Sequence, residues 1–127
     1  MWYNMCMRIE LTLSTFVPEV RRITRDTSAN DPIHQDSDVY HALVDAFRHL
    51  YAIRPESRYS KVGQIEDIDF PKDDASLGDF VVSFDDRWRL GILYFAAARC
   101  YEADVTDSVN LQLAQTLFKS AEQEFLR

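Results

Sequence analysis

Residues 85–125, DDRWRLGILYFAAARCYEADVTDSVNLQLAQTLFKSAEQEF, constrain the fold more than any other part of the chain. Apolar side chains lie nearly all round a predicted helix over 85–103, which is typical of a central helix covered on several sides. A short acidic connector follows, so a second helix over 107–126 is expected to return antiparallel to the first. Its apolar residues recur at four-residue spacing: Val109, Leu113, Leu117, Ala121 and Phe125.

Two further helices are predicted upstream, near residues 14–26 and 37–53. The first rests on an apolar stripe at helical spacing: Leu13, Phe16, Val17, Val20 and Ile23. Pro18 is compatible with it if it lies in the first turn. Pro55 ends the second helix, because the residue before a proline avoids helical dihedral angles. Three Gly and four Pro in 127 residues argue against a turn-rich β-sandwich. We therefore predict one all-α domain over 1–127, built from four main helices.

The segment 57–84 has no helical period and is predicted to be a long irregular interaction loop. Within it, residues 79–84, DFVVSF, favour a strand, so a short β-hairpin is one form this loop can take. Residues 1–10 are expected to form an N-terminal arm. Deleting residues 64–80 is expected to leave the helical domain folded. The predicted helical core has six central members: Phe47, Leu50, Leu93, Ala97, Leu113 and Leu117.

The charge of the chain is uneven. It has 21 acidic and 14 basic residues, for a net charge of −7. The segment 66–86 holds eight carboxylates against Lys72 alone, which equals the whole imbalance. Such a surface repels nucleic acid and anionic membranes. No apolar run of about 18 residues is present, so no membrane span is predicted. Cys6 and Cys100 lie far apart in the sequence, and no disulfide framework is indicated.

Candidate sites for chemistry are few. His41, Asp45 and His49 share one helix face at i, i+4 and i+8, but a closed metal site needs a further ligand. A solvated polar face is the simpler interpretation, and neither a metal nor a cofactor is predicted. The acidic loop does not match an EF-hand calcium-binding loop. If the loop starts at Asp67, its sixth position must be glycine, but Lys72 stands there. With no nucleophile–base pair and no glycine-rich phosphate loop, an enzyme is not indicated.

Arg21, Arg22 and Arg25 give the first helix a basic edge. A helix that contacts DNA carries such residues, but Glu19, Asp26 and the acidic loop oppose that role here. Salt bridges within the protein or across a subunit interface are the favoured interpretation.

Short sequence motifs lie at the ends of the predicted helices. The helix within 12–27 ends in the acidic turn TRDT, and the helix within 36–57 ends in the phrase RP. The alanine- and aromatic-rich helix within 87–125 ends in the acidic phrase YEAD. With these segments, most of the chain resembles the head–tail connector, or adaptor, proteins of tailed bacteriophages.

The resemblance implies a structural virion protein without catalytic activity or cofactor. Members form rings, usually twelve-fold, below the portal protein, where the ring extends the DNA channel and docks a stopper or tail-completion protein. Packaged DNA passes through without specific binding, no membrane is involved, and the subunit is made in the host cytoplasm before it joins the neck. Candidate interface or channel residues are Tyr59, Glu66, Asp67, Asp69, Phe70, Asp73, Asp74, Phe80, Arg21, Arg22 and Arg25.

A second hypothesis belongs to a different class. The chain is then a small helical binding or regulatory protein that contacts one protein partner as a monomer or dimer. The mass of the protein in solution, alone and with a portal protein, distinguishes the two.

Overall fold

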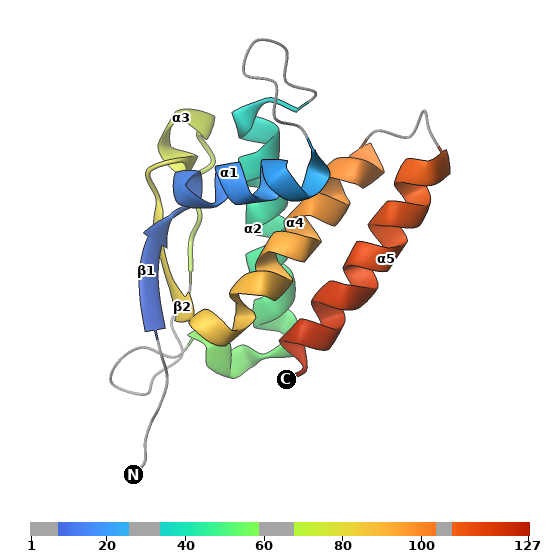
Figure 1. The fold of residues 1–127 in the computed structure, drawn as a ribbon. Coiled ribbons are helices and arrows are strands. Elements are labelled where there is room, and N and C mark those ends of the chain that lie inside the picture. Colours follow the sequence, from blue (N-terminus) through green and yellow to red (C-terminus); the bar gives the residue numbers. More distant parts are fainter. Residues whose placement is uncertain (1–7, 26–33, 59–67, 104–107) are drawn as a thin grey trace.

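The computed structural model describes residues 8–25, 34–58, 68–103 and 108–127 (Figure 1). Of the described residues 74% are helical, and a two-stranded antiparallel sheet accompanies the helices. The mostly helical fold is thus confirmed, with a small sheet added to it. The elements in chain order are β1 (Arg8–Thr12), α1 (Leu13–Thr24), α2 (Asp36–Ile53), η1 (Pro55–Arg58), α3 (Asp74–Leu77), β2 (Val81–Asp85), η2 (Asp86–Trp88), α4 (Arg89–Ala103) and α5 (Ser108–Phe125).

Helix α4 is central, as its all-round apolar sequence predicts. Helices α1, α2 and α5 all pack against it, and α5 returns antiparallel beside it (Figure 1). Gly91 permits the close approach of α4 and α5, because a Cβ at this position would lie 2.6 Å from Cε1 of the buried Phe125. Arg54, just after α2, donates from Nε to the Phe125 carbonyl oxygen over 2.8 Å. This bond satisfies one carbonyl at the end of α5.

Helix α1 begins one residue before the predicted start, and this changes the position of its proline. Because the helix starts at Leu13, Pro18 lies in the second turn and not in the first. At the N-terminus of α1, the amides of Leu13 and Ser14 donate to the carbonyl oxygens of Phe80 and Gly78, each over 3.1 Å. The helix is therefore tied to the segment that precedes β2. The helix ends at Thr24, and the capping residue Arg25 adopts a left-handed conformation with φ of 60°.

Strand β2 confirms the strand predicted within 79–84, but its partner was not predicted. It pairs antiparallel with β1, with Ile9 opposite Phe84 and Leu11 opposite Val82. The prediction of a β-hairpin within 57–84 is therefore wrong for the described part of the chain. Of the N-terminal arm predicted over 1–10, the residues from Arg8 onward form strand β1. The reason is that Ile9 and Leu11 supply the alternating apolar side chains that pack beside those of β2.

The described part of the loop, 68–80, contributes to the core instead of extending from it. Phe70 and Leu77 are buried, and Phe80 is partly buried against the same core. Deleting residues 64–80 would remove these side chains, so the structure argues against the expectation that the helices fold normally without this segment. Burying an aromatic or leucine side chain stabilises a fold by about 1.5–3 kcal/mol, which the deletion would forfeit at several positions.

Four of the six predicted core residues are buried: Phe47, Leu50, Leu93 and Ala97. Leu117 is partly buried, and Leu113 is 40% exposed, so its assignment to the core is wrong. The residues of α5 that are buried are Ala114, Ala121 and Phe125. Small side chains bring α5 close to α4, and this contact turns the face that holds Leu113 outward.

Candidate interaction surfaces

The candidate residues of the loop do not form one surface among the residues that the structure describes. Tyr59, Glu66 and Asp67 lie outside the described residues. Asp69 is exposed, whereas Phe70 is 5% exposed and packs inside the subunit.

Phe70 and Phe80 are anchors of the loop. Their ring centroids lie 5.1 Å apart, and the Phe70 ring lies 6.3 Å from that of Phe47. The Arg48 guanidinium covers Phe70 at 5.9 Å from the ring centroid. These contacts fix the path of the chain toward α3, so the two phenylalanines position the acidic residues that follow and do not themselves offer a free surface.

A corner around α3 keeps the acidic character predicted for this region. We define the acidic corner as Asp73, Asp74, Asp79 and Val81. All four are exposed, and Val81 reaches 54%. Asp73 caps α3, since its Oδ1 accepts from the Ala75 amide over 3.2 Å.

Two other members of the acidic corner face charged or titratable groups on α2. Asp74 Oδ1 lies 2.7 Å from His41 Nε2, which links the corner to α2. Burial, followed by the negative charges of Asp36 and Asp79, raises the pKa of the Tyr40 hydroxyl. Asp79 forms no ion pair with any residue that the structure describes. Its carboxylate is therefore available to a partner.

The three arginines of α1 take different positions in the structure. Arg21 forms an ion pair of 2.6 Å with Asp36 and so ties α1 to the start of α2, which is one of the two roles predicted for these residues. Arg25 is exposed at the end of α1. Arg22 is exposed and lines a groove.

This groove lies between α1, the start of α4 and the end of α5, and its volume is about 490 Å³. Three apolar side chains line it: Ile23, Leu90 and Leu93. Its charged lining consists of Glu19, Arg22, Asp86, Arg87, Arg89, Glu124 and Arg127. We call these ten residues the α1–α4–α5 groove.

Some charges of the groove are paired internally and others face outward. Glu19 accepts from Arg89 over 2.6 Å, and Glu124 lies 3.2 Å from Arg127. The Arg87 guanidinium lies 4.3 Å from the Trp88 ring centroid, and its Nε lies 3.4 Å from Asp85 Oδ2, while its side chain remains 53% exposed. Arg22 makes no ion pair with a residue in the described part of the chain. Asp86 is also exposed, so the lining holds four arginines and three carboxylates and is of mixed charge.

The first turns of α5 form a third surface, which sequence periodicity did not reveal. Val109, Leu111 and Leu113 are 55%, 41% and 40% exposed. Between Ser108 and Ala121 the only charged residue is Lys119. A solvated helix face normally carries charged residues, so this missing charge was the available signal. Val109, Gln112, Leu113 and Thr116 share one side of the helix at i, i+3, i+4 and i+7, whereas Leu111 faces another direction. We define the α5 surface as Val109, Gln112, Leu113 and Thr116.

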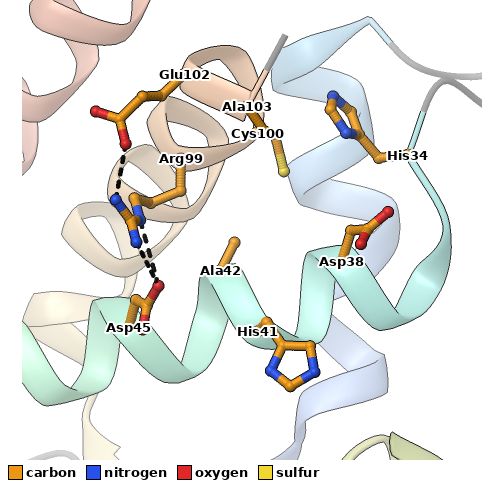
Figure 2. A pocket seen from close by; sticks show the side chains of 9 residues that line it. All are labelled: His34, Asp38, His41, Ala42, Asp45, Arg99, Cys100, Glu102 and Ala103. Atoms are coloured by element: carbon orange, nitrogen blue, oxygen red, sulfur yellow. Dashed lines mark hydrogen bonds and ion pairs between the residues drawn. The ribbon is translucent and has the colours of Figure 1, made fainter.

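A pocket of about 620 Å³ lies beside the end of α4 and the start of α2 (Figure 2). Arg99 occupies one side of it, 2.9 Å from Asp45 and 2.7 Å from Glu102. The hydrogen bond to Asp45 raises the pKa of the Arg99 guanidinium, although burial works against this. Both carboxylates are thus engaged by one arginine, an arrangement that braces α2 against α4. It does not resemble an acid–base pair.

The three residues weighed as metal ligands do not converge. His41 points away from Arg99, toward α3 (Figure 2), and Asp45 accepts from Arg99. His49 stacks on Phe95 with ring centroids 4.8 Å apart. In the described ranges no group of three or more His, Cys, Asp or Glu residues is arranged to hold a metal ion.

Comparison with known proteins yields no match to a family model, to a curated protein or to a solved structure. Among the described helices, none combines the length and the apolar character needed to cross a membrane.

Proposed function

We propose that this chain is a structural head–tail connector subunit of a tailed bacteriophage, which assembles as a ring below the portal protein. The observation that carries the proposal is the α5 surface. Val109 and Leu113 expose apolar side chains on the same side of α5, in a stretch whose only charged residue before Glu122 is Lys119. Apolar residues grouped on an exposed helix are typical of a site that a partner covers.

A ring subunit needs three different surfaces. Two complementary ones contact the neighbours on either side, because head-to-tail contacts close into a ring. The third contacts the next component along the axis. The α1–α4–α5 groove, the acidic corner and the α5 surface are candidates for these three contacts, and the stopper or tail-completion protein on the far side of the ring would bind a fourth surface. We assign the α5 surface to the portal protein, since its uncharged character suits a stable contact of the apolar kind.

The acidic residues also suit the proposed position. Carboxylates that face a DNA channel repel phosphates and let the duplex pass without specific binding. Asp69 is exposed and suits such a lining. Asp85, by contrast, is 7% exposed and accepts from the Arg87 amide over 3.0 Å, so it stabilises the turn before α4. The proposed role includes a stopper or tail-completion protein as the partner on the far side of the ring.

Purified virions test this function. The chain is expected in intact particles of the phage that encodes it, at a copy number close to that of the portal protein, usually twelve. Quantitative mass spectrometry with labelled peptides of both proteins measures this ratio. A chain that is abundant in infected cells and missing from particles would contradict the proposal and favour the small binding or regulatory protein.

A further inference from the structure

We propose that the open edge of β1 binds an extended segment of a partner protein, which adds to the sheet as a third strand. In this segment a basic residue lies between two apolar residues and pairs with Glu10. The inference goes beyond the connector proposal, because that proposal makes no use of this edge.

The pairing of β1 with β2 determines which backbone groups the sheet leaves open. The Leu13 amide donates to the Phe80 carbonyl oxygen over 3.1 Å, and the antiparallel register continues unbroken along β1. Hydrogen-bonded pairs alternate with non-hydrogen-bonded pairs in such a ladder. The backbone groups of Ile9 and Leu11 therefore point toward β2, and those of Glu10 point away from it. No backbone hydrogen bond joins Glu10 to another segment of the described chain.

The two edges of this sheet differ. Ser83 of β2 lies opposite Glu10, and its carbonyl group likewise points away from the partner strand. This carbonyl oxygen accepts from Arg8 Nη2 over 3.1 Å, and the Ser83 hydroxyl accepts from Arg8 Nε over 3.2 Å. One side chain thus covers the outer edge of β2 at this point. Strand β1 lies at the outside of the molecule (Figure 1), and its edge has no such cover among the described residues.

An open edge specifies the chemistry of its occupant. A row of backbone donors and acceptors at strand spacing is satisfied by another extended chain, and strand addition of this kind is a recurring mode of peptide recognition. The ligand of the β1 edge is accordingly an extended polypeptide segment.

The side chains of β1 define the sequence of that segment. Glu10 is exposed and makes no ion pair with a described residue. A lysine or arginine directly opposite it on the added strand forms a favourable cross-strand pair. Ile9 and Leu11 point to the other face of the sheet, where they are partly buried against the core. The two neighbours of the basic residue lie opposite them, and apolar side chains there extend the core.

A second copy of this chain fits the edge less well than a different protein. The only basic residue of β1 is Arg8, and its guanidinium already binds Ser83. The β1 strand of a second copy therefore offers no free cation to Glu10. Each copy also carries a net charge of −7, which opposes the approach of another copy.

A designed peptide tests the inference. The probe is the pentapeptide Thr-Val-Lys-Val-Thr with blocked ends, which is titrated into the isotope-labelled chain and followed by NMR. We expect saturable shift changes confined to β1 and its neighbours in the sheet. In the free chain the Glu10 amide should exchange rapidly with solvent, and the bound peptide should slow this exchange by at least about tenfold, since the amide then donates to the peptide.

Matched peptides separate strand addition from other modes of binding. A methyl group on the lysine amide nitrogen removes a hydrogen bond to Glu10 and should abolish binding. The same methyl group on the first valine should have little effect, because that amide points away from β1. A peptide with glutamate in place of lysine should bind at least about tenfold more weakly, because it places like charges opposite each other.

Two variants of the chain complete the test. Glu10→Pro removes the open amide but no hydrogen bond to β2, as proline is tolerated at a strand edge; it should fold, as circular dichroism verifies, and lose binding. Glu10→Gln keeps the open amide and should retain weaker binding. The inference is overturned if the peptide gives no saturable change, if the lysine-methylated peptide or Glu10→Pro binds normally, or if the Glu10 amide is already protected in the free chain. Concentration-dependent changes at β1 without peptide would identify a second copy as the occupant and also overturn it. None of these outcomes affects the connector proposal, which portal binding tests separately.

Discussion

Replacing Phe47 with alanine is expected to lower the free energy of unfolding by about 3–5 kcal/mol, the range for truncating a buried phenylalanine. Phe47 is fully buried, and its ring lies at the centre of an aromatic cluster that joins three segments. Its centroid is 6.0 Å from that of Phe16, 5.5 Å from that of Phe84 and 6.3 Å from that of Phe70. The substitution leaves a cavity between α1, α2, β2 and the loop, so one change weakens all their contacts.

Urea denaturation followed by circular dichroism measures this loss. Leu126→Ala is the control, since Leu126 is 62% exposed and its truncation should change stability by less than about 0.5 kcal/mol. Equal effects of the two substitutions would show that the aromatic cluster does not hold the domain together.

Replacing Leu113 with glutamate is expected to weaken binding to the portal protein by at least about a hundredfold, because burying an uncompensated charge costs several kcal/mol. Leu113 is 40% exposed in the free chain, so the substitution should leave the fold nearly unchanged. The loss should therefore appear in binding and not in the unfolding transition.

Gln123→Glu is the matched control, since it adds the same charge to an exposed position of α5 beyond the α5 surface. Surface plasmon resonance on immobilised portal rings compares the two variants with the unaltered chain. If Leu113→Glu binds as tightly as Gln123→Glu, the α5 surface is not the portal contact.

Helical periodicity predicted the four long helices because each has an apolar face and clear end signals. Pro55 predicted the end of α2, and the acidic residues before α4 predicted its start. The structure places both within a few residues of the predicted positions. The same periodicity could not show how α5 is rotated. Ala114 and Leu113 are both apolar, and the close contact with α4 selects the smaller side chain for burial.

Two features of the fold depend on contacts between distant parts of the sequence, which local patterns do not encode. Strand β1 pairs with β2, which lies far from it in the sequence. The alternation of apolar and polar residues over the five residues of β1 is too short to be recognised alone. The burial of Phe70 likewise depends on Phe47 and Phe80, which converge only in the folded chain. An apolar residue in an acidic loop therefore suggested an interface, although its partner is the subunit's own core.

The candidate surfaces were predicted unevenly for the same reason. Arg22 and the acidic residues of the corner were recognised from charge alone. That Arg22 lies beside Leu90 and Arg87, and that Val81 lies beside Asp79, required the packing of α1 on α4 and the pairing of β2. Sequence supplied the charged groups, and tertiary structure supplied the apolar centres that make these surfaces candidates for assembly.

The central claim is that this chain forms a ring on the portal protein, and electron cryomicroscopy of the two purified proteins together tests it most directly. The account predicts a closed ring of copies coaxial with the portal, usually twelve, with α5 against the portal. A single copy or a two-fold dimer bound to the side of the portal, or no complex at all, would contradict it.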